Sequence, residues 1–476
     1  MGAAQGSCEA AWLTPSFSRW TLRGMFDVVV VGGGVVGCAV ARRFTLQGAR
    51  VLLLEKAADI LSGASKGNSA ILHTGFDAPA DSLELACIQA GHAEYLAIRE
   101  QLGLPLRASG AIVAAWSAEQ AQALPRIVAA AHANGVADAR EITSAEILHR
   151  EPGLSPAVLG GVLVPGEALI DPWSAPLAYL LQALENGAEV RRQTELYSGT
   201  FSGIWNLQTS TGAVQAKTLI NCAGLYGDVV EERLLGATHF TIRPRKGQFV
   251  VFDKAAAKHL GTILLPVPEA HTKGIVLTPT IFGNLLVGPT AEDQEDRARA
   301  ATDEGSLRML VARAEAMLPA LRGMPVTAAY AGIRPATEEK HYRVRHEPAQ
   351  NYIALGGIRS TGLTAALGLA AHAWALHNGT QSLIRAPIPA PIASPIWPQA
   401  PRLAEHDTRD WQAPDHGEII CHCEMVTRRE IEAALAGPLP ARDAGGLKRR
   451  TRAGMGRCQG FYCHASLAAL TAGRFA

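Results

Sequence analysis

The first regular pattern in the chain is a run of apolar residues that do not alternate with polar ones. Residues 26–31 (FDVVVV) predict a buried strand, and residues 32–46 continue as a glycine-rich turn and a helical pattern. Residues 50–55 (RVLLLE) predict a second buried strand. A strand, a helix and a strand in this order predict one βαβ unit of a parallel sheet.

The same alternation of elements returns further along the chain. Asp171 and Pro172 predict the start of a helix that reaches about Asn186, because aspartate caps helices and proline suits their first turn. A strand at residues 189–191 follows, and residues 217–222 (KTLINC) predict another buried strand with a helix behind it. Together these elements predict a doubly wound α/β domain that the chain leaves and re-enters.

Two intervening segments show a different pattern. Residues 100–165 and 238–330 carry short strands in which apolar and polar positions alternate, for example 247–252 and 284–287. Such alternation is typical of strands with one solvent-facing side. We therefore expect these segments to build a second, antiparallel domain.

The end of the chain has the pattern of a linker and a small separate domain. Residues 386–401 contain six prolines, which disfavour helix and sheet and favour an extended spacer. We therefore expect a proline-rich linker over residues 386–415 and a small domain over residues 416–476. Residues 1–24 lack the apolar core of a secretory signal and are interpreted as an extension of the main domain at 25–385.

Composition and charge exclude several classes of protein. The 44 Lys and Arg residues nearly cancel the 43 Asp and Glu residues, so no overall field attracts nucleic acid. The basic run at 448–450 has no aromatic platform beside it, which argues against nucleic-acid binding there as well. The most apolar run, residues 28–41, is short and contains four glycines, which excludes a transmembrane helix. We expect a cytoplasmic protein whose membrane contact, if any, is made through a partner.

Gly32, Gly34 and Gly37 have the spacing of a dinucleotide-binding turn between a strand and a helix. The first glycine permits the tight turn, the second admits the pyrophosphate, and the third allows close packing of the helix. Glu55, followed by Lys56, stands at the end of the second predicted strand, where a carboxylate can accept hydrogen bonds from a ribose. An ordinary glycine-rich turn is the alternative interpretation.

The sequence has one such turn, whereas a flavoenzyme that also binds NAD through the same motif would need two. Three later segments, 62–69, 221–224 and 360–364, place small residues where a long cofactor can be contacted again. In the last of them, amides at a helix start could reach the flavin ring. A loop or helix cap without a ligand is the alternative for each segment. The residues expected to contact the cofactor there are Ser65, Asn68, Ser69, Cys222, Ala223, Gly224, Gly362, Leu363 and Thr364.

Several motifs together resemble the group of FAD-dependent glycerol-3-phosphate dehydrogenases and oxidases and L-2-hydroxyglutarate oxidases, within the D-amino-acid-oxidase-like superfamily. The resemblance covers about residues 25–385 and identifies the group rather than the substrate. It rests on GGGVVG (32–37) with Glu55 and Lys56, GASKGNSAILHTGFD (63–77), RPRKGQFVVFDK (243–254), GNLLVGPTAED (283–293), AGIRPA (331–336) and RSTGLTAALGLA (359–370).

The resemblance implies hydride transfer from a substrate C–H bond to the flavin, assisted by three residues. His73 matches the family histidine near the flavin and is the candidate base, with a purely structural histidine as the alternative. Arg334 would clamp the anionic end of the substrate, and Lys246 would add a charge nearby. For Lys246, a surface salt bridge remains the competing interpretation.

Four cysteines near the C-terminus form two close pairs. Cys421 and Cys423 are separated by one residue, and Cys458 and Cys463 by four. Four thiolates suit either one tetrahedral metal such as zinc or a two-iron two-sulfur cluster. The surrounding sequence, including RAGMGRCQGFYC (452–463), resembles the bacterioferritin-associated-ferredoxin-like (BFD-like) domain, which implies a [2Fe–2S] cluster and leaves zinc as the alternative.

The predicted fold is therefore α/β + α: a Rossmann-type FAD-binding domain interleaved with an antiparallel substrate domain, followed by a small helical BFD-like module. The resemblance implies a dehydrogenase of a small anionic substrate, with glycerol-3-phosphate first and a 2-hydroxyacid, amino acid or opine second. Electrons would leave through the cluster to an acceptor protein or a quinone-linked partner subunit. The alternatives are a zinc-tethered adaptor and a non-catalytic electron-transfer subunit. The sequence leaves the acceptor and the oligomeric state open.

Overall fold

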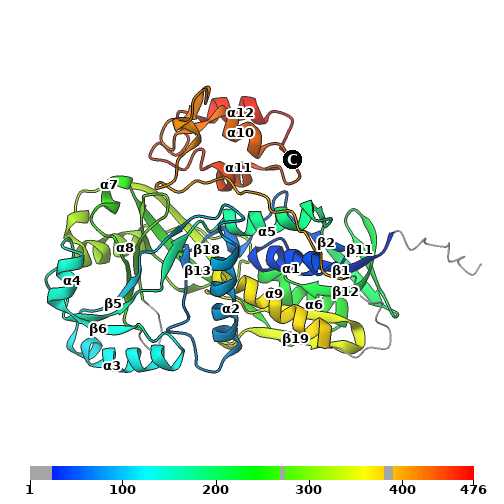
Figure 1. Ribbon diagram of the computed structural model, residues 1–476, viewed down its shortest axis with the longest axis horizontal. Helices are drawn as coiled ribbons and strands as arrows, with labels where there is room; N and C mark the ends of the chain where they lie inside the picture. Colours follow the sequence, from blue (N-terminus) through cyan, green and yellow to red (C-terminus); the bar gives the residue numbers. More distant parts are fainter. Residues whose placement is uncertain (1–23, 269–273, 380–389, 476) are drawn as a thin grey trace, which may run out of the picture.

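The computed structural model describes residues 24–268, 274–379 and 390–475. The predicted N-terminal extension lies outside these residues except for Gly24. Two large sheets form the body of the molecule, and a small C-terminal domain lies against both of them (Figure 1).

The first sheet has a parallel centre in which β1 lies between β12 and β2. Val28 and Val30 of β1 pack into one hydrophobic cluster and Val29 and Val31 into another, so this strand is covered on both faces. The strands are β1 (Phe26–Val31), β2 (Val51–Leu54), β9 (Glu189–Arg191), β10 (Leu196–Phe201), β11 (Trp205–Thr209), β12 (Gly212–Asn221), β19 (Arg343–Glu347) and β20 (Tyr352–Gly356). The predicted βαβ unit and Rossmann-type domain are confirmed.

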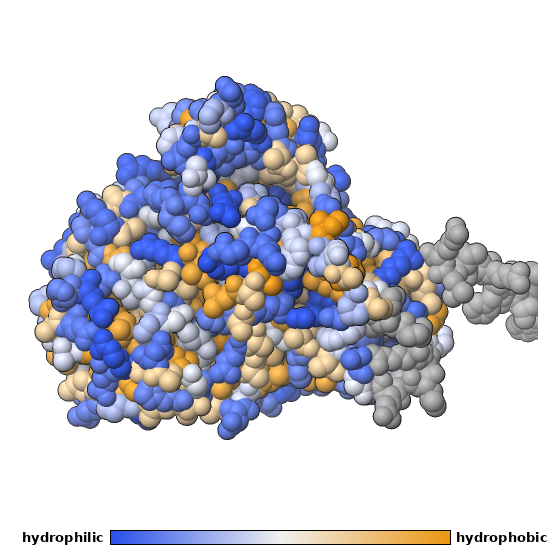
Figure 2. Space-filling view, in the orientation of Figure 1, coloured by the Kyte–Doolittle hydropathy of each residue, from blue (hydrophilic) through white to orange (hydrophobic). Residues whose placement is uncertain are grey.

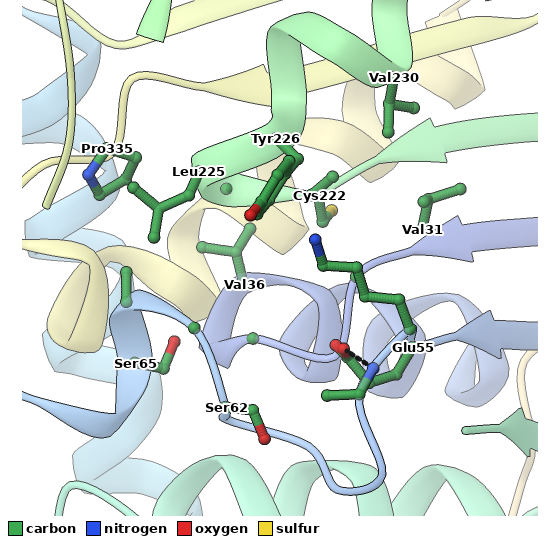
Figure 3. Close-up of a pocket in the computed structure, with 18 of the residues that line it drawn as sticks. Val31, Val36, Glu55, Ser62, Ser65, Cys222, Leu225, Tyr226, Val230 and Pro335 are labelled. Atoms are coloured by element: carbon green, nitrogen blue, oxygen red, sulfur yellow. Dashed lines mark hydrogen bonds between the residues drawn. The ribbon is translucent and has the colours of Figure 1, made fainter. Parts of the chain in front are cut away.

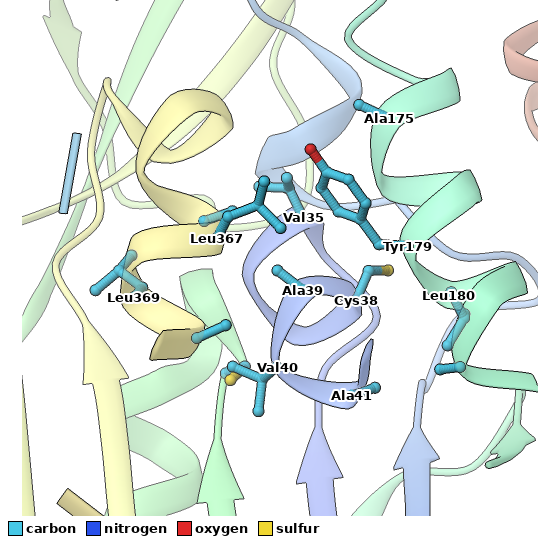
Figure 4. Close-up of a cluster of buried hydrophobic side chains, with 14 of the residues drawn as sticks. Val35, Cys38, Ala39, Val40, Ala41, Ala175, Tyr179, Leu180, Leu367 and Leu369 are labelled. Carbon is cyan, nitrogen blue, oxygen red and sulfur yellow. The ribbon is translucent and has the colours of Figure 1, made fainter. Parts of the chain in front are cut away.

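One face of this sheet is covered by helices that pack closely on one another. Figure 4 shows α1 (Val35–Leu46) between α5 (Ser174–Glu185) and α9 (Gly362–Gly379). The helix α2 (Leu83–Ile98) crosses α9, and α6 (Gly227–Leu235) covers the opposite face.

The α2 and α9 backbones touch at two glycines. A Cβ atom on Gly91 would lie 2.0 Å from the carbonyl oxygen of Thr364, and one on Gly368 would lie 2.1 Å from that of Cys87. Neither position admits a side chain unless the helices separate. This contact fixes the start of α9 against α2.

The predicted start of α5 is wrong by two residues. The helix begins at Ser174, so Pro172 is not its first residue. Asp171 nevertheless caps the turn, because its Oδ1 accepts hydrogen bonds from the amides of Trp173 and Ser174. A short turn therefore separates the capping carboxylate from the helix.

The second sheet is antiparallel except where β14 pairs in parallel with β5. Its longest pair joins β13 and β18, with Arg245 opposite Arg334. The strands are β5 (Ala111–Ala115), β6 (Arg140–Thr143), β7 (Gly160–Val164), β13 (Ile242–Phe252), β14 (Ile263–Pro266), β15 (Val276–Pro279), β16 (Leu285–Gly288), β17 (Glu292–Asp293) and β18 (Val326–Thr337). The helices α3 (Ala118–Ala133), α4 (Ser144–Arg150), α7 (Lys254–Ala257) and α8 (Glu304–Met317) accompany it.

A small three-stranded sheet joins these two parts. The strand β8 (Ala168–Ile170) lies between β3 (Ile71–Leu72) and β4 (Leu106–Arg107). In this antiparallel register Leu72 pairs with Ala168. The residues that come next, His73 after β3 and Glu167 before β8, therefore face each other.

The C-terminal domain has its own hydrophobic cluster. It contains β21 (Ile419–Cys421), β22 (Val426–Thr427), α10 (Arg428–Ala434), α11 (Ala444–Thr451) and α12 (His464–Thr471). In Figure 2 it forms a separate lobe at the top, and the face turned to the viewer is mainly hydrophilic.

The segment before this domain is extended but packed. Within residues 390–415 the described elements amount to one short 3-10 turn at Asp410–Gln412. The amide of Ile392 donates to the carbonyl of Leu46, and that of Ala400 donates to Leu102. This proline-rich segment is therefore an extended stretch that packs along the first domain. Residues 386–389 of the predicted spacer lie outside the described residues.

Buried ions hold the C-terminal domain in place. Asp59, fully buried behind β2, pairs with Arg450 at 2.7 Å and with Arg192 at 3.3 Å. Arg452 pairs with Glu424 at 2.8 Å, and its guanidinium lies 4.0 Å from the ring centre of Phe282. The contacts of Arg450 and Arg452 with Asp59 and Phe282 join the C-terminal domain to the body of the molecule.

Candidate functional site

The turn between β1 and α1 and the first turn of α1 each have one position with room for glycine alone. Gly32 has φ +108°, and a Cβ atom there would lie 2.5 Å from the carbonyl oxygen of Cys222. A Cβ atom on Gly37 would lie 1.9 Å from the carbonyl oxygen of Gly32. These contacts hold the turn flat against the end of β12, so that the start of α1 faces an open cavity.

This cavity has a volume of about 450 Å³ and lies at the carboxyl ends of the parallel strands (Figure 3). Its position matches the binding crevice of doubly wound sheets. Of the residues predicted to contact a cofactor, nine line it: Gly32, Gly34, Glu55, Lys56, Ser65, Cys222, Ala223, Gly224 and Gly362.

Glu55 is held by backbone amides at the edge of the cavity. Its Oε2 accepts a hydrogen bond from Gly33 at 2.7 Å, and its Oε1 accepts one from Ala57 at 2.7 Å. Burial raises the pKa of Glu55, and the two amides oppose this effect. Each oxygen keeps a second lone pair for a ribose hydroxyl.

The remaining predicted cofactor residues lie around the cavity without lining it. The Asn68 side chain accepts from the amide of Ala70 at 2.6 Å and stabilises its own loop. Thr364 accepts from the amide of His73 at 3.0 Å and links α9 to β3. Gly37 packs beneath the turn, while Ser69 and Leu363 do not line the cavity.

The structure adds lining residues that sequence reasoning missed. Tyr226 lies under the Lys56 ammonium group, which is 3.1 Å from the ring centre, a cation–π contact. Arg297 lines the same side and pairs with Asp228. Their segments follow two predicted elements, but only the folded chain brings them to the cavity.

His73 is paired with a carboxylate that the sequence analysis did not single out. Its Nδ1 lies 2.9 Å from Oε2 of Glu167, whose side chain is fully buried. The other oxygen of Glu167 accepts from the amide and hydroxyl of Thr74 at 2.6 and 2.8 Å. Glu167 is thereby fixed to accept the Nδ1 proton of His73, which places the imidazole lone pair on Nε2.

Arg334 belongs to a group of three arginines. Its Nη2 donates to the carbonyls of Thr290 at 2.7 Å and Lys246 at 3.2 Å, while its buried Nε has no partner among the described residues. Burial, with Arg245 and Arg359 nearby, lowers the pKa of Arg334 to about 10. No carboxylate in the described residues forms a salt bridge with Arg334, although Asp293, which lies 3.7 Å from Arg245, offsets part of the positive charge of the group.

Lys246 is in a different situation from Arg334. Its Nζ lies 2.9 Å from Oε2 of Glu292 and 3.8 Å from Oδ2 of Asp303. Its charge is therefore already compensated, which corresponds to the salt-bridge interpretation left open by the sequence.

The four clustered cysteines converge in the C-terminal domain. Cys421 and Cys423 come from β21 and the turn after it, and Cys463 precedes α12. The thiols interact as Cys423 with Cys458 and as Cys421 with Cys463, and all four are free of disulfides. Hydrogen bonds from the backbone, that of Tyr462 first, lower the pKa of Cys458, whereas burial raises the pKa of Cys463 to about 11.

These thiols fit a metal centre by their chemistry. Thiolates are the donors that iron–sulfur clusters and structural zinc share. In the part of the chain that the structure describes, no three His, Cys, Asp or Glu side chains are already arranged around one metal position. The donors are thus gathered as two interacting pairs.

Comparison with known proteins agrees with this geometry. Residues 27–376 match the FAD dependent oxidoreductase family model, and residues 419–472 match the BFD-like [2Fe-2S] binding domain. The chain belongs to the FAD dependent oxidoreductase family and ends in a BFD-like domain.

Three similar proteins are named for an activity on glycerol 3-phosphate. A glycerol 3-phosphate dehydrogenase of Caloramator mitchellensis is 30% identical over 92% of both chains. One chain of the anaerobic glycerol-3-phosphate dehydrogenase of Escherichia coli K12 is 25% identical, over 93% of this chain and 87% of its own. An FAD-bound, dithionite-reduced L-alpha-glycerophosphate oxidase from Mycoplasma pneumoniae superposes with a TM-score of 0.70 at 28% identity, covering 74% of this chain and 95% of its own.

The protein is therefore an FAD-dependent oxidoreductase, as the sequence analysis predicted. The cavity beside Gly32 and Glu55 fits the dinucleotide part of FAD, since it combines a helix start, a carboxylate and small residues. No helix in the described residues is long and apolar enough to cross a membrane.

Proposed function

We propose that this protein oxidises glycerol-3-phosphate to dihydroxyacetone phosphate and passes the electrons through a [2Fe–2S] cluster to a partner. The observation that carries the proposal is the uncompensated Arg334, grouped with Arg245 and Arg359. The names of the similar proteins support the same substrate. Bound FAD supplies the acceptor for the hydride of the substrate C–H bond.

The start of α9 lies between the two parts of the proposed substrate site, the arginine group and His73. Arg359 precedes α9 and neighbours Arg334, while Thr364 in its first turn holds the backbone of His73. Gly362, between them, lines the cofactor cavity. A substrate lying across the start of α9 would place its anionic end toward the arginines and its hydroxyl toward the histidine.

His73 would take the hydroxyl proton at Nε2. Because Glu167 accepts the Nδ1 proton, the buried carboxylate also stabilises the imidazolium that forms. The two hydrogen bonds from Thr74 keep Glu167 in place during this transfer. Proton removal and hydride loss then occur on the same carbon–oxygen unit.

The arginines favour an anion with more than one negative charge. A guanidinium holds phosphate or carboxylate oxygens in pairs, and three of them match a phosphate dianion better than a single carboxylate. Lys246 would contribute only if substrate displaced Glu292. A 2-hydroxyacid or an amino acid with a single carboxylate would compensate less of this charge, whereas the two carboxylates of L-2-hydroxyglutarate carry the same total charge on two separate groups.

Electron exit requires the cluster rather than zinc at the four cysteines. Bound FAD would take both electrons of the hydride, and a [2Fe–2S] cluster held by the four cysteines would pass them on one at a time. The C-terminal domain contacts the parts of the chain that carry both large sheets, which supports its use as a relay to an acceptor protein or a quinone-linked subunit.

An anaerobic spectrum tests the proposal. Iron, labile sulfide, zinc and FAD are first measured in protein purified without air, and glycerol-3-phosphate is then added. We expect two irons per chain and bleaching of the flavin bands by glycerol-3-phosphate. Bleaching only by L-2-hydroxyglutarate or an amino acid would contradict the substrate, and zinc without iron would contradict the relay.

A further inference from the structure

Two aromatic side chains stand out on the surface of the C-terminal domain. Phe461 is 81% exposed and Tyr462 is 76% exposed, more than any other large hydrophobic residue described in the structure. Their rings form an edge-to-face pair with centres 5.2 Å apart. Exposed aromatic groups of this kind mark interaction sites.

The pair occupies the turn between two of the cluster cysteines. The amide of Phe461 donates to the carbonyl of Cys458, and that of Cys463 donates to Gly460, so both ends of the turn are fixed. The turn is also closed by Gly460, whose φ is +92° and whose missing side chain leaves room for the His464 ring. The aromatic rings are thus presented on a hydrogen-bonded turn whose backbone amides contact the Cys458 thiol.

The sequence on both sides of this turn carries charge of one sign. Residues 444–476 contain six Lys or Arg residues and no Asp or Glu. Arg449, Arg450 and Arg452 are buried against the body of the molecule. The remaining three, Lys448, Arg457 and Arg474, are not buried.

Two carboxylates compensate part of this charge and leave Lys448 and Arg474 without a salt bridge among the described residues. Asp253, from the body of the molecule, pairs with Arg457 at 2.7 Å, and Glu424 is buried against Arg452. The turn is therefore an apolar centre next to basic groups, and an acidic partner surface complements it.

We propose that Phe461 and Tyr462 form the docking site for an electron-acceptor protein whose contact surface is apolar at its centre and acidic at its rim. The inference deepens the proposed function and rests on it, because a docking site here serves a redox cluster. In the transfer step one electron leaves the reduced cluster and reduces one acceptor centre. No bond forms or breaks, and no proton moves.

The test uses full-length holoprotein that is reduced with dithionite and then freed of excess reductant. Reduction in this way makes the result independent of the substrate, and the iron and sulfide content reports separately on the cluster. The acceptors are the soluble domain of cytochrome b5, which is acidic, cytochrome c, which is basic, and ferricyanide, which is small. Stopped-flow absorbance gives each second-order rate constant, and biolayer interferometry gives the affinity of the oxidised protein for cytochrome b5.

The variant is the double substitution Phe461→Ser/Tyr462→Ser, and the control is Tyr197→Ser on β10. Tyr197 is 54% exposed in the body of the molecule. We expect the double variant to slow the reduction of cytochrome b5 and to weaken its binding, each by about tenfold or more, as for aromatic hot spots. The control variant should match the wild type, and the ferricyanide rate should stay the same in all three proteins.

Each other outcome would overturn the inference. Equal rates and affinities for wild type and double variant would remove the aromatic pair from the interface. If the wild type at low salt reduced the basic cytochrome c faster than the acidic cytochrome b5, the result would contradict an acidic partner. An equal loss with ferricyanide at unchanged iron and sulfide content would show that the pair affects electron release from the cluster itself and not docking. A wild-type dimer that the double variant dissociates would assign the surface to a second copy of this chain.

Discussion

The pairing of His73 with Glu167 fixes the orientation of the His73 ring and favours the tautomer that carries its proton on Nδ1. The carboxylate is fully buried, accepts from Thr74 twice, and is hydrogen-bonded to the ring of His73. At the same scale Arg334 shows the opposite arrangement, a cation with no carboxylate paired to it among the described residues. Each arrangement is unusual for a purely structural residue and leads to a separate prediction.

Replacement of Glu167 by Gln should lower kcat by about 10- to 100-fold, because the amide cannot stabilise the imidazolium formed at His73. A carboxylate favours the protonated ring, so its loss should move the acidic limb of the kcat/KM profile to lower pH. Glu231→Gln in α6, which alters a similar pair with His239, is the matched control and should leave the profile in place. An unchanged profile in Glu167→Gln would contradict the positioning role.

Replacement of Arg334 by Met should raise the KM for glycerol-3-phosphate by about 10- to 100-fold, since charge-assisted hydrogen bonds are lost. The thermal transition of the substrate-free protein should stay the same or rise, because a desolvated and uncompensated cation is removed. Arg308→Met in α8, where the arginine is 79% exposed, is the control. A lower melting temperature with an unchanged KM would assign Arg334 a structural role instead.

At the level of secondary structure, local sequence patterns were sufficient to predict the elements themselves. They were not sufficient to predict which distant residues pair. The turn from Gly32 to Gly37 is encoded within adjacent residues, so the strand, turn and helix could be predicted. The pairing of His73 with Glu167 spans 94 positions and depends on the β3–β8 register. A signal was present, because Glu167 is the single acid in the apolar run 162–170.

The arginine group was hidden for the same reason. Arg245 faces Arg334 only because of the β13–β18 register. Arg359 lies in a different part of the chain, between β20 and α9. The parallel pairing of β14 with β5 was missed as well, because alternation predicts a strand but not its partner.

The contact between α2 and α9 supports a prediction about Gly368. Substitution by Ala would place a Cβ atom 2.1 Å from the carbonyl of Cys87, so the helices must separate, at a cost of about 1–3 kcal/mol in the free energy of unfolding. Because Thr364 on the same helix holds the backbone of His73, kcat should fall too. Denaturant unfolding and initial rates measure both effects.

The control for this substitution is Gly305→Ala in α8. A Cβ atom there makes only ordinary contact, 3.6 Å from Asp303, and alanine favours helix over glycine. This variant should be as stable as the wild type or more stable. If Gly368→Ala behaves in the same way, the close contact of the helices is not a constraint.

For the whole molecule, buried ions join the C-terminal domain to the body in addition to the packed segment before it. Burial raises the pKa of Asp59, but the hydrogen bond from Arg450 overcomes this, and the pKa lies below its usual value. The stability that this pair provides is therefore present at neutral pH. It is lost only as pH falls below the ordinary range of an aspartate, near 3.8.

Replacement of Asp59 by Asn should release the C-terminal domain locally, because Arg450 and Arg192 would remain buried without a carboxylate. Breaking one side of such a group costs about 3–5 kcal/mol. Hydrogen exchange in α11 should rise markedly at pH 7, while Glu189→Gln, which removes an exposed pair with Arg50, should have no effect. Unchanged protection of α11 would show that other contacts hold the domain.

The turn that follows β2 joins the dinucleotide cavity to the C-terminal domain within seven residues. Glu55 at its start faces the dinucleotide cavity, Asp59 binds Arg450, and the carbonyl of Ile60 accepts from Arg449. The amide of Leu61 then returns to the carbonyl of Gly33 in the glycine turn. A replacement iron–sulfur module fused at residue 416 would have to supply both arginines at these positions. The C-terminal domain thus packs directly against the turn that borders the flavin cavity, so it cannot be exchanged without replacing these contacts.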